Sequence, residues 1–298
     1  MAVIALVLLL THPALSFKGA SRGLLLWYKT VLPTLLPFMI CSGLIVSLGG
    51  IRLLTAPVRP VFKRLFGMSD AGCYVMVSGL LCGYPMGAKT CGEFVDEGRI
   101  SPSEGRYLLS VSNHPSPMFL LGYAAPAAGA FLPVPLMLAA IYLPLIPMAF
   151  LSRQIYGAGE NSAALPESRK NRQSFDQSMM NSFEVMIKIG GYIMLFSILA
   201  EFVEQIQSVS PAAKACLLGI VEITTGIRAL SRTLTGIPLG AALCFVSAFG
   251  GLCGLFQTRS VLKSPRLSIS HYLLWKLLHG CLSMAVFTLL AYMLLPGR

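Results

Sequence analysis

Long apolar stretches with very few charges between them run through this 298-residue chain and leave few folds open to it. Charged residues make up 12% of the sequence and apolar residues 55%, whereas a typical soluble domain has about 25% charged residues. This balance excludes an ordinary water-soluble globule, a disordered chain and a coiled coil. The sequence therefore predicts an all-α, polytopic helical membrane protein.

Four apolar runs are long enough to cross a bilayer, which takes about 20 residues of helix. They cover residues 24–49, 123–151, 183–206 and 272–295. Two prolines, Pro33 and Pro37, should kink the first of these spans. The first 17 residues are also apolar, but no positive charge precedes their apolar stretch. We therefore expect a short first helix there rather than a cleaved signal peptide.

Four further apolar runs are broken by glycine, proline or polar residues. They cover residues 71–90, 110–122, 212–230 and 239–257. Irregular backbone at membrane depth is tolerated only inside protein or beside a water-filled cavity. In transporters such broken segments mark the binding site.

A polar stretch divides the chain into halves that share the order of their features. The first half has V-S-G-L-L-C-G at 77–83 and the second V-S-A-F-G-G-L-C-G at 246–254. Each is followed by R-I-S or R-L-S and then by Y-L-L, so we expect two related half-bundles about a pseudo-twofold axis, with a site between them. The predicted parts are a short apolar segment (1–23), a first membrane repeat (24–151), a polar linker (152–182) and a second membrane repeat (183–298).

Several classes of function find no support in the sequence. The net charge of +11 comes mostly from short polar stretches between apolar runs, which indicates topology and lipid headgroups rather than nucleic acid. No hydrolase, metalloprotease or dinucleotide-binding motif is present, so we expect no enzyme. The eight cysteines form no C-x-x-C pair, and we expect neither a metal nor a cofactor. The expected partners are a small-molecule substrate and the bilayer, and a homo-oligomer stays open.

The first candidate binding segment is G-Y-P-M-G-A-K-T at 83–90. Its two glycines and its proline prevent a regular helix and free backbone groups for a ligand. Lys89 adds a cation and Thr90 a hydroxyl, which suits a carboxylate or phosphate near a helix N-terminus. The alternative is a re-entrant hairpin tip whose Lys89 reaches the lipid headgroups. The candidate contacts are Gly83, Tyr84, Pro85, Gly87, Lys89 and Thr90.

The second candidate is S-N-H-P-S-P at 112–117, where two prolines indicate a broken helix. Asn113 and Ser116 are candidates to hydrogen-bond a polar substrate, and His114 is a candidate proton carrier. The alternative is an ordinary turn at the membrane interface.

The third candidate is Glu222, an acidic residue inside an apolar run, where a charge is costly without a partner or a function. It would coordinate Na⁺ or H⁺, and Thr224 and Thr225 would supply further oxygens. The structural alternative is an ion pair with Arg228 or Lys214.

The fourth candidate is S-A-F-G-G-L-C-G at 247–254. Ser247, Gly250 and Gly251 are the candidate substrate contacts, because the glycines permit a tight turn next to the hydroxyl. Simple helix packing through small residues is the alternative.

These motifs together resemble a known family. The segments at 83–90, 97–101 (E-G-R-I-S) and 112–119 (S-N-H-P-S-P-M-F) resemble the sporulation integral membrane proteins of the YlbJ type, within the nucleoside-recognition, or Gate, domain family. The segment V-E-I-T-T-G at 221–226 is similar to the same pattern. The resemblance extends from about residue 24 to residue 295.

The resemblance implies Gate-like repeats related to concentrative nucleoside transporters, and a role in endospore formation. It also implies movement of dipicolinate, a small aromatic dicarboxylate, toward the forespore across the outer forespore membrane. In this interpretation paired re-entrant tips meet, Lys89 neutralises a substrate carboxylate, and Glu222 couples to H⁺ or to a cation such as Na⁺. Glu222 would repel the dianion unless it is protonated or paired. A non-transporting scaffold of spore envelope assembly and a nucleoside carrier are the alternatives.

Overall fold

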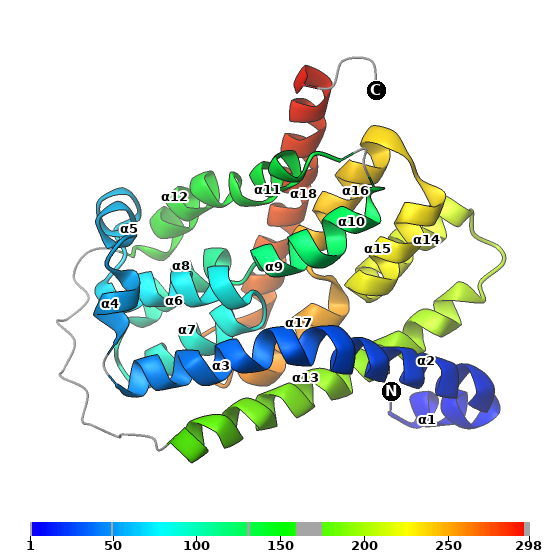
Figure 1. The fold of residues 1–298 in the computed structure, drawn as a ribbon, viewed down its shortest axis with the longest axis horizontal. Helices are drawn as coiled ribbons and strands as arrows, with labels where there is room; N and C mark the ends of the chain where they lie inside the picture. The colour runs from blue at the N-terminus through cyan, green and yellow to red at the C-terminus, as the bar shows by residue number, and fades with distance from the viewer. Residues whose placement is uncertain (1, 49, 130–131, 159–174, 295–298) are drawn as a thin grey trace.

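The computed structural model describes residues 2–48, 50–129, 132–158 and 175–294, and every regular element in these ranges is a helix (Figure 1). The elements up to residue 127 are α1 (Ala2–Thr11), α2 (Pro13–Leu26), the π-helical turn η1 (Trp27–Val31), α3 (Leu32–Ser47), α4 (Ile51–Thr55), α5 (Arg59–Phe66), α6 (Asp70–Cys82), α7 (Met86–Asp96), α8 (Pro102–Ser112), α9 (Pro117–Phe119), the π-helical turn η2 (Leu120–Ala124) and α10 (Ala125–Ala127). The later elements are α11 (Val134–Tyr142), α12 (Leu145–Tyr156), α13 (Phe175–Glu204), α14 (Pro211–Val221), α15 (Ile223–Thr233), α16 (Gly236–Phe249), α17 (Gly251–Val261) and α18 (Ile269–Leu294). The predicted all-α fold is confirmed.

Five helical stretches among the described residues are long and apolar enough to cross a membrane. They are Pro13–Ile45, Val134–Tyr156, Phe175–Glu204, Gly236–Val261 and Ile269–Leu294. The pair α5 and α6, bent by 111°, makes a sixth if it is one broken span. The chain is thus a polytopic helical membrane protein, as predicted.

The spans differ from the predicted ones in extent. The first begins at Pro13, and its helix α3 continues through Pro33 and Pro37 after the π-helical turn η1. The run predicted as broken at 239–257 is interrupted only at Gly250 and lies within a candidate span. The expected short first helix is α1. Helices α12 and α13 take up both ends of the predicted linker, and 159–174 lie outside the described residues.

Helix α2 lies against α13 (Figure 1), and small residues and charges together hold the two helices in contact. A Cβ on Gly19 would lie only 2.5 Å from the Cα atom of Ile198, so the two backbones are in direct contact. Gly19 opens the sequence G-A-S-R-G, and G-x-x-x-G is the pattern that allows membrane helices to approach this closely. Beside it, the buried carboxylate of Glu201 forms ion pairs with Lys18 and Arg22.

Two three-helix units, α6–α7–α8 and α16–α17–α18, have the same order of elements. In each unit a broken helix is followed by an eleven-residue helix (α7 or α17) and then by a helix whose first turn a serine caps. Ser101 accepts from the backbone of Glu104, and Ser268 accepts from that of His271. This common order agrees with the repeat expected from the sequence, and a duplication of the chain stays a prediction.

The two units nevertheless differ in geometry, which corrects the expectation of paired re-entrant tips. Helix α7 folds back along α6, and the hydroxyls of Ser78 on α6 and Thr90 on α7 accordingly lie 3.1 Å apart across the hairpin. Helices α16 and α17 instead continue as one candidate span of 26 residues. Of the two expected tips, only the first, at 83–85, therefore folds back as a hairpin in this structure.

Candidate functional site

Four interruptions of helices meet in the interior of the fold. The breaks are residues 83–85 between α6 and α7, 113–116 between α8 and α9, Glu222 between α14 and α15, and Gly250 between α16 and α17. Each falls within one of the four segments that the sequence predicts to be broken. Because a helix break leaves backbone groups without intrahelical partners, their meeting point is suited to bind a polar ligand.

Glycines bring these breaks into contact. A Cβ on Gly83 would lie 2.7 Å from the backbone nitrogen of Ser116, so the first break packs on the second. A Cβ on Gly250 would lie 3.6 Å from the ring of Tyr84, and one on Gly251 would lie 3.5 Å from the backbone nitrogen that opens α15. The predicted residues Gly83, Tyr84, Ser116, Gly250 and Gly251 are therefore brought together. Gly87 packs next to them, because a Cβ there would lie 2.2 Å from the carbonyl oxygen of the residue before Asn113.

A network of polar side chains, which we call the central polar cluster, lies at this meeting point. It consists of Tyr84, Asn113, Thr258, Tyr272 and Lys276. The Asn113 amide nitrogen donates to the Tyr272 hydroxyl at 2.7 Å and to the Thr258 hydroxyl at 3.0 Å. Its side-chain oxygen accepts from the backbone of α7 at 3.3 Å. Asn113 thus joins the first half of the chain to α17 and α18.

Lys276 is the one lysine that the structure buries in this cluster, and its side chain is only 2% exposed. Its ammonium donates to the carbonyl of Asn113 at 3.0 Å and lies 5.7 Å from the centre of the Tyr84 ring. None of the ion pairs formed among the described residues involves it. Helix α18 therefore presents an ammonium to the breaks at Tyr84 and Asn113, and this ammonium has no carboxylate partner among the described residues.

Several buried polar atoms on the elements that form the breaks and the cluster have no hydrogen-bond partner within the described part of the chain. They are the hydroxyl oxygens of Tyr84, Ser112, Ser247 and Ser283 and the Nε2 atom of His114. Buried polar atoms are nearly always hydrogen-bonded in folded proteins. Atoms left open in this way mark where a polar ligand or water would bind, and two of them belong to the predicted residues Tyr84 and Ser247.

Glu222 is buried, but its carboxylate is used as a helix cap. It accepts from the backbone nitrogens of Thr224 at 3.0 Å and Thr225 at 2.7 Å, and from the Thr224 hydroxyl at 2.6 Å. The partial positive charge of the α15 N-terminus offsets its negative charge. The alternative of an ion pair with Arg228 or Lys214 does not occur among the described residues, and a role in ion coupling stays a prediction.

Two predicted contacts point away from the cluster. Lys89 forms an ion pair at 2.6 Å with Glu93, one turn along α7, and its side chain is 19% exposed. Thr90 is bonded to Ser78 inside the α6–α7 hairpin. In this structure the cation next to the helix breaks is Lys276, and a substrate contact by Lys89 stays a prediction. Pro85 lies in the break and is joined to Tyr84 by a cis peptide bond.

Helix α18 carries functional candidates that the sequence motifs missed. The polar residues Tyr272, Lys276, His279 and Ser283 recur at intervals of four, three and four residues and are all buried. This spacing places them on one face of a helix. The signal is present in the sequence as charged and polar residues at helical spacing inside an apolar run, which in membrane helices indicates function.

One known protein resembles the chain over nearly its whole length. It is the sporulation integral membrane protein YlbJ of Bacillus subtilis, which is 26% identical over 326 aligned residues covering 95% of this chain and 79% of that protein. No protein-family model matches the chain, and no solved structure matches it. The resemblance to YlbJ-type sporulation membrane proteins is thus confirmed, and the relation to the Gate domain stays a prediction.

Proposed function

We propose that this protein is a membrane transporter or channel that moves a small anionic metabolite during sporulation, with dipicolinate as the first substrate to test. The name of its relative, a sporulation integral membrane protein, supports a place in sporulation. The outer forespore membrane is the location that the family resemblance implies.

The observation that carries the proposal is the buried ammonium of Lys276. A charge inside a membrane segment is costly and is retained where it pairs or serves a function. No acidic side chain pairs with Lys276 among the described residues, and its hydrogen bond goes to a neutral carbonyl. An anionic substrate would supply the missing counter-charge as it passes.

The neighbours of Lys276 suit a planar dicarboxylate. The Tyr84 ring offers a flat face, and its hydroxyl has no partner in the described part of the chain, so it can donate to a carboxylate oxygen. Glu222, which would repel a dianion, is compensated by the three hydrogen bonds at the start of α15. Glu222 therefore repels an anionic substrate less strongly than an uncompensated carboxylate would.

The test is uptake of labelled dipicolinate into proteoliposomes that contain the purified protein. Lys276→Met removes the charge and keeps an unbranched side chain. We expect uptake to fall at least tenfold, because the buried charge pair between the ammonium and the substrate carboxylate can no longer form. The matched control is Lys188→Met, since Lys188 lies exposed on α13 in an ion pair with Glu184. Lys89→Ala, which removes the other candidate cation, should leave most of the uptake in place.

Each alternative predicts a different result. A scaffold without transport activity predicts no uptake by the wild-type protein, which would overturn the proposal. A nucleoside carrier predicts uptake of labelled uridine and no competition by dipicolinate. Equal uptake by the wild type and by Lys276→Met would remove Lys276 from the site.

A further inference from the structure

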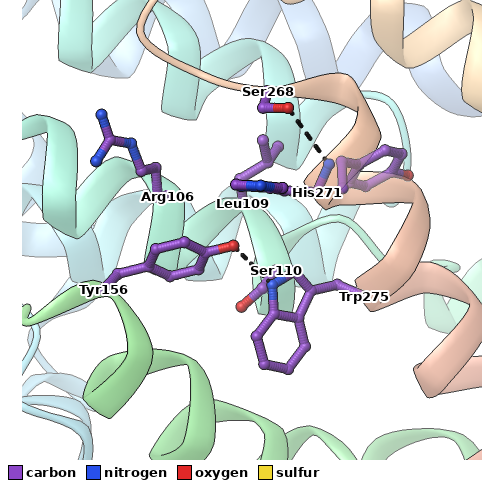
Figure 2. A pocket seen from close by; sticks show the side chains of 8 residues that line it. Arg106, Leu109, Ser110, Tyr156, Ser268, His271 and Trp275 are labelled. Carbon is purple, nitrogen blue, oxygen red and sulfur yellow. Dashed lines mark hydrogen bonds between the residues drawn. The ribbon is translucent and has the colours of Figure 1, made fainter.

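A narrow pocket opens at the surface where α8, α12 and α18 meet (Figure 2). Its free volume of about 10 Å³ suits a single group such as one carboxylate oxygen or one water. Its lining includes Arg106, Tyr156, Ser268, His271, Tyr272 and Trp275. None of the residues that line it is acidic.

The pocket combines positive charge with aromatic walls. Arg106 is exposed, donates through Nε to the carbonyl of Arg266 at 3.3 Å, and keeps its terminal nitrogens free of ion pairs among the described residues. The Tyr156 ring lies 6.3 Å from that of His271 and 6.4 Å from that of Trp275. A guanidinium and flat rings that line the same pocket suit a planar aromatic anion.

Tyr272 separates this pocket from the central polar cluster. It lines the pocket, yet its hydroxyl accepts from Asn113 at 2.7 Å and lies 3.4 Å from the Thr258 hydroxyl. Lys276 follows one helical turn later on the same face of α18. One buried phenol therefore stands between the surface pocket and the unpaired ammonium.

We propose that this pocket is an outer binding site for a planar carboxylate, and that Tyr272 is the gate between it and the central polar cluster. The inference rests on the proposed function and adds to it a first binding site and a path. Arg106 holds one carboxylate at the mouth of the pocket with a single oxygen inside it, while the ring of the anion lies against Tyr156 and His271. Breaking the hydrogen bond from Asn113 to Tyr272 opens the way to Lys276.

The binding site can be tested apart from transport, because the sequence contains only two tryptophans. Trp27→Phe leaves Trp275, whose indole nitrogen donates to the Tyr156 hydroxyl in the pocket wall at 2.9 Å, as the sole fluorophore. We expect dipicolinate to change the emission of Trp275 saturably, and we expect no effect of uridine, whose base is planar but uncharged. Uptake by the Trp27→Phe protein is measured first, to show that this background is intact.

Arg106→Gln in this background should raise the half-saturating dipicolinate concentration about fivefold, as expected for one partly exposed charge contact. For Arg106→Lys, which keeps the charge, the half-saturating concentration should lie between the values of the parent and of Arg106→Gln. The matched control is Arg232→Gln, an exposed arginine at the end of α15. Equal binding by Arg106→Gln and its parent, or no saturable change at Trp275, would overturn the site.

The gate is tested with Tyr272→Phe, which keeps the ring and removes the hydroxyl. Binding at Trp275 should stay within about twofold, while the maximal uptake rate rises about threefold because one hydrogen bond no longer holds the gate closed. An unchanged or lower uptake rate would contradict the gate.

The two proposals fail in different ways. Dipicolinate uptake without a response at Trp275 would overturn the outer site and leave the proposed function standing. A saturable, Arg106-dependent response without uptake would support the anion site and overturn the transport function.

Discussion

At the scale of single residues, Lys276 sets a conflict between stability and function. An ammonium taken out of water loses several kcal/mol of hydration, and the single hydrogen bond to the Asn113 carbonyl restores only part of it. We therefore predict that Lys276→Met raises the free energy of unfolding by about 1–2 kcal/mol. The variant should then unfold at a higher temperature than the wild type while losing uptake. Thermal unfolding of both proteins in the same detergent measures this.

Lys188→Met serves as the control for Lys276→Met, since it removes an exposed lysine from another long helix and should change the unfolding temperature little. A purely structural lysine predicts the opposite sign. If Lys276→Met unfolded several degrees below the wild type, the ammonium would be holding the central polar cluster together rather than waiting for an anion.

The two lysines also show what sequence reasoning can and cannot resolve. Lys89 attracts attention because it follows a glycine- and proline-rich break, but the helical turn that follows directs it to Glu93. Lys276 lies in an unbroken apolar run and is found only by following polar residues at helical spacing. Which of the two lysines faces the interior depends on how helices distant in the sequence pack together. The residues next to each lysine do not determine that packing.

At the scale of elements, the four helix breaks were predictable and their contacts were not. Glycine, proline and a lone acidic residue interrupt helices for local reasons, so the sequence locates all four broken segments. The sequence cannot tell that α6 and α7 fold back while α16 and α17 run on, because both contain glycines at the break. That difference depends on which helices pack against each pair.

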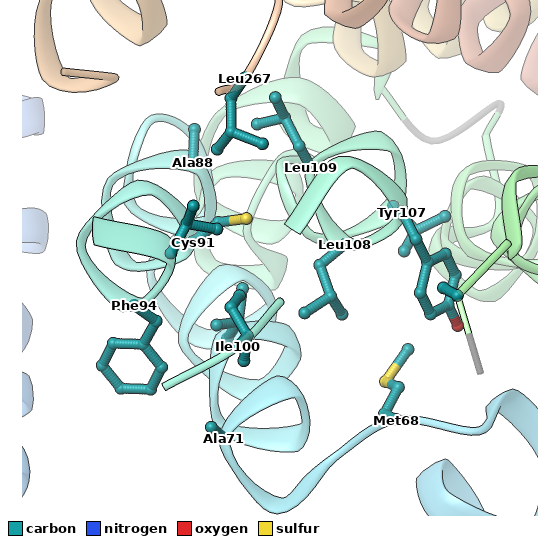
Figure 3. Packing of buried hydrophobic residues seen from close by; sticks show 14 of the residues in the cluster. Met68, Ala71, Ala88, Cys91, Phe94, Ile100, Tyr107, Leu108, Leu109 and Leu267 are labelled. Atoms are coloured by element: carbon teal, nitrogen blue, oxygen red, sulfur yellow. The ribbon is translucent and has the colours of Figure 1, made fainter. Parts of the chain in front are cut away.

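The packing of α6 against α8 depends on a close approach at Gly79. A Cβ there would lie 1.8 Å from the carbonyl oxygen of Ser112, inside the unit whose apolar side chains Figure 3 shows packed between α6, α7 and α8. We predict that Gly79→Ala destabilises the protein by about 1–3 kcal/mol, since backbone cannot move aside cheaply. Thermal unfolding in detergent measures the loss.

Gly191→Ala is the matched control for Gly79→Ala. Gly191 also lies inside a helix, α13, but a Cβ there would meet nothing within 4 Å. Alanine is preferred over glycine in a helix, so this variant should be as stable as the wild type or slightly more stable. Equal stability of the two variants would contradict the close approach at Gly79.

The start of α15 provides the second prediction at this scale. Glu222→Ala removes the acceptor of three hydrogen bonds and leaves buried backbone nitrogens without partners. We predict a loss of about 1–3 kcal/mol, measured by thermal unfolding, whereas Glu184→Ala on the exposed face of α13 should change little. Wild-type stability in Glu222→Ala would show that the carboxylate is free for ion coupling instead.

At the scale of the whole molecule, contacts between distant helices decide which ends share a side of the membrane. Arg106 near the start of α8 is bonded to the carbonyl of Arg266, before α18. Tyr156 at the end of α12 accepts from Trp275 near the start of α18. The ends of α7, α12 and α17 therefore lie on one side, and this is the side on which the outer pocket opens.

Two membrane topologies then differ in how the stretch Gly236–Val261 is placed. At 1.5 Å per residue its 26 residues are about 39 Å long, which exceeds the hydrocarbon core of about 30 Å. A continuous span places Thr235 and Lys263 on opposite sides, whereas a re-entrant hairpin with its tip at Gly250 places them on the same side. The half-bundle symmetry expected from the sequence favours the hairpin, and the helix geometry favours the span.

Single cysteines at Asp96, Thr235 and Lys263, all exposed in the structure, separate these topologies. The background is the protein with its exposed cysteines Cys41, Cys216 and Cys281 replaced by serine. In sealed vesicles of one orientation, we predict that a membrane-impermeant thiol reagent labels positions 96 and 263 together and position 235 only after permeabilisation, or the reverse in inverted vesicles. Labelling of 235 together with 263 would make α16 and α17 a hairpin, and the two units would then be alike in geometry as well as in order.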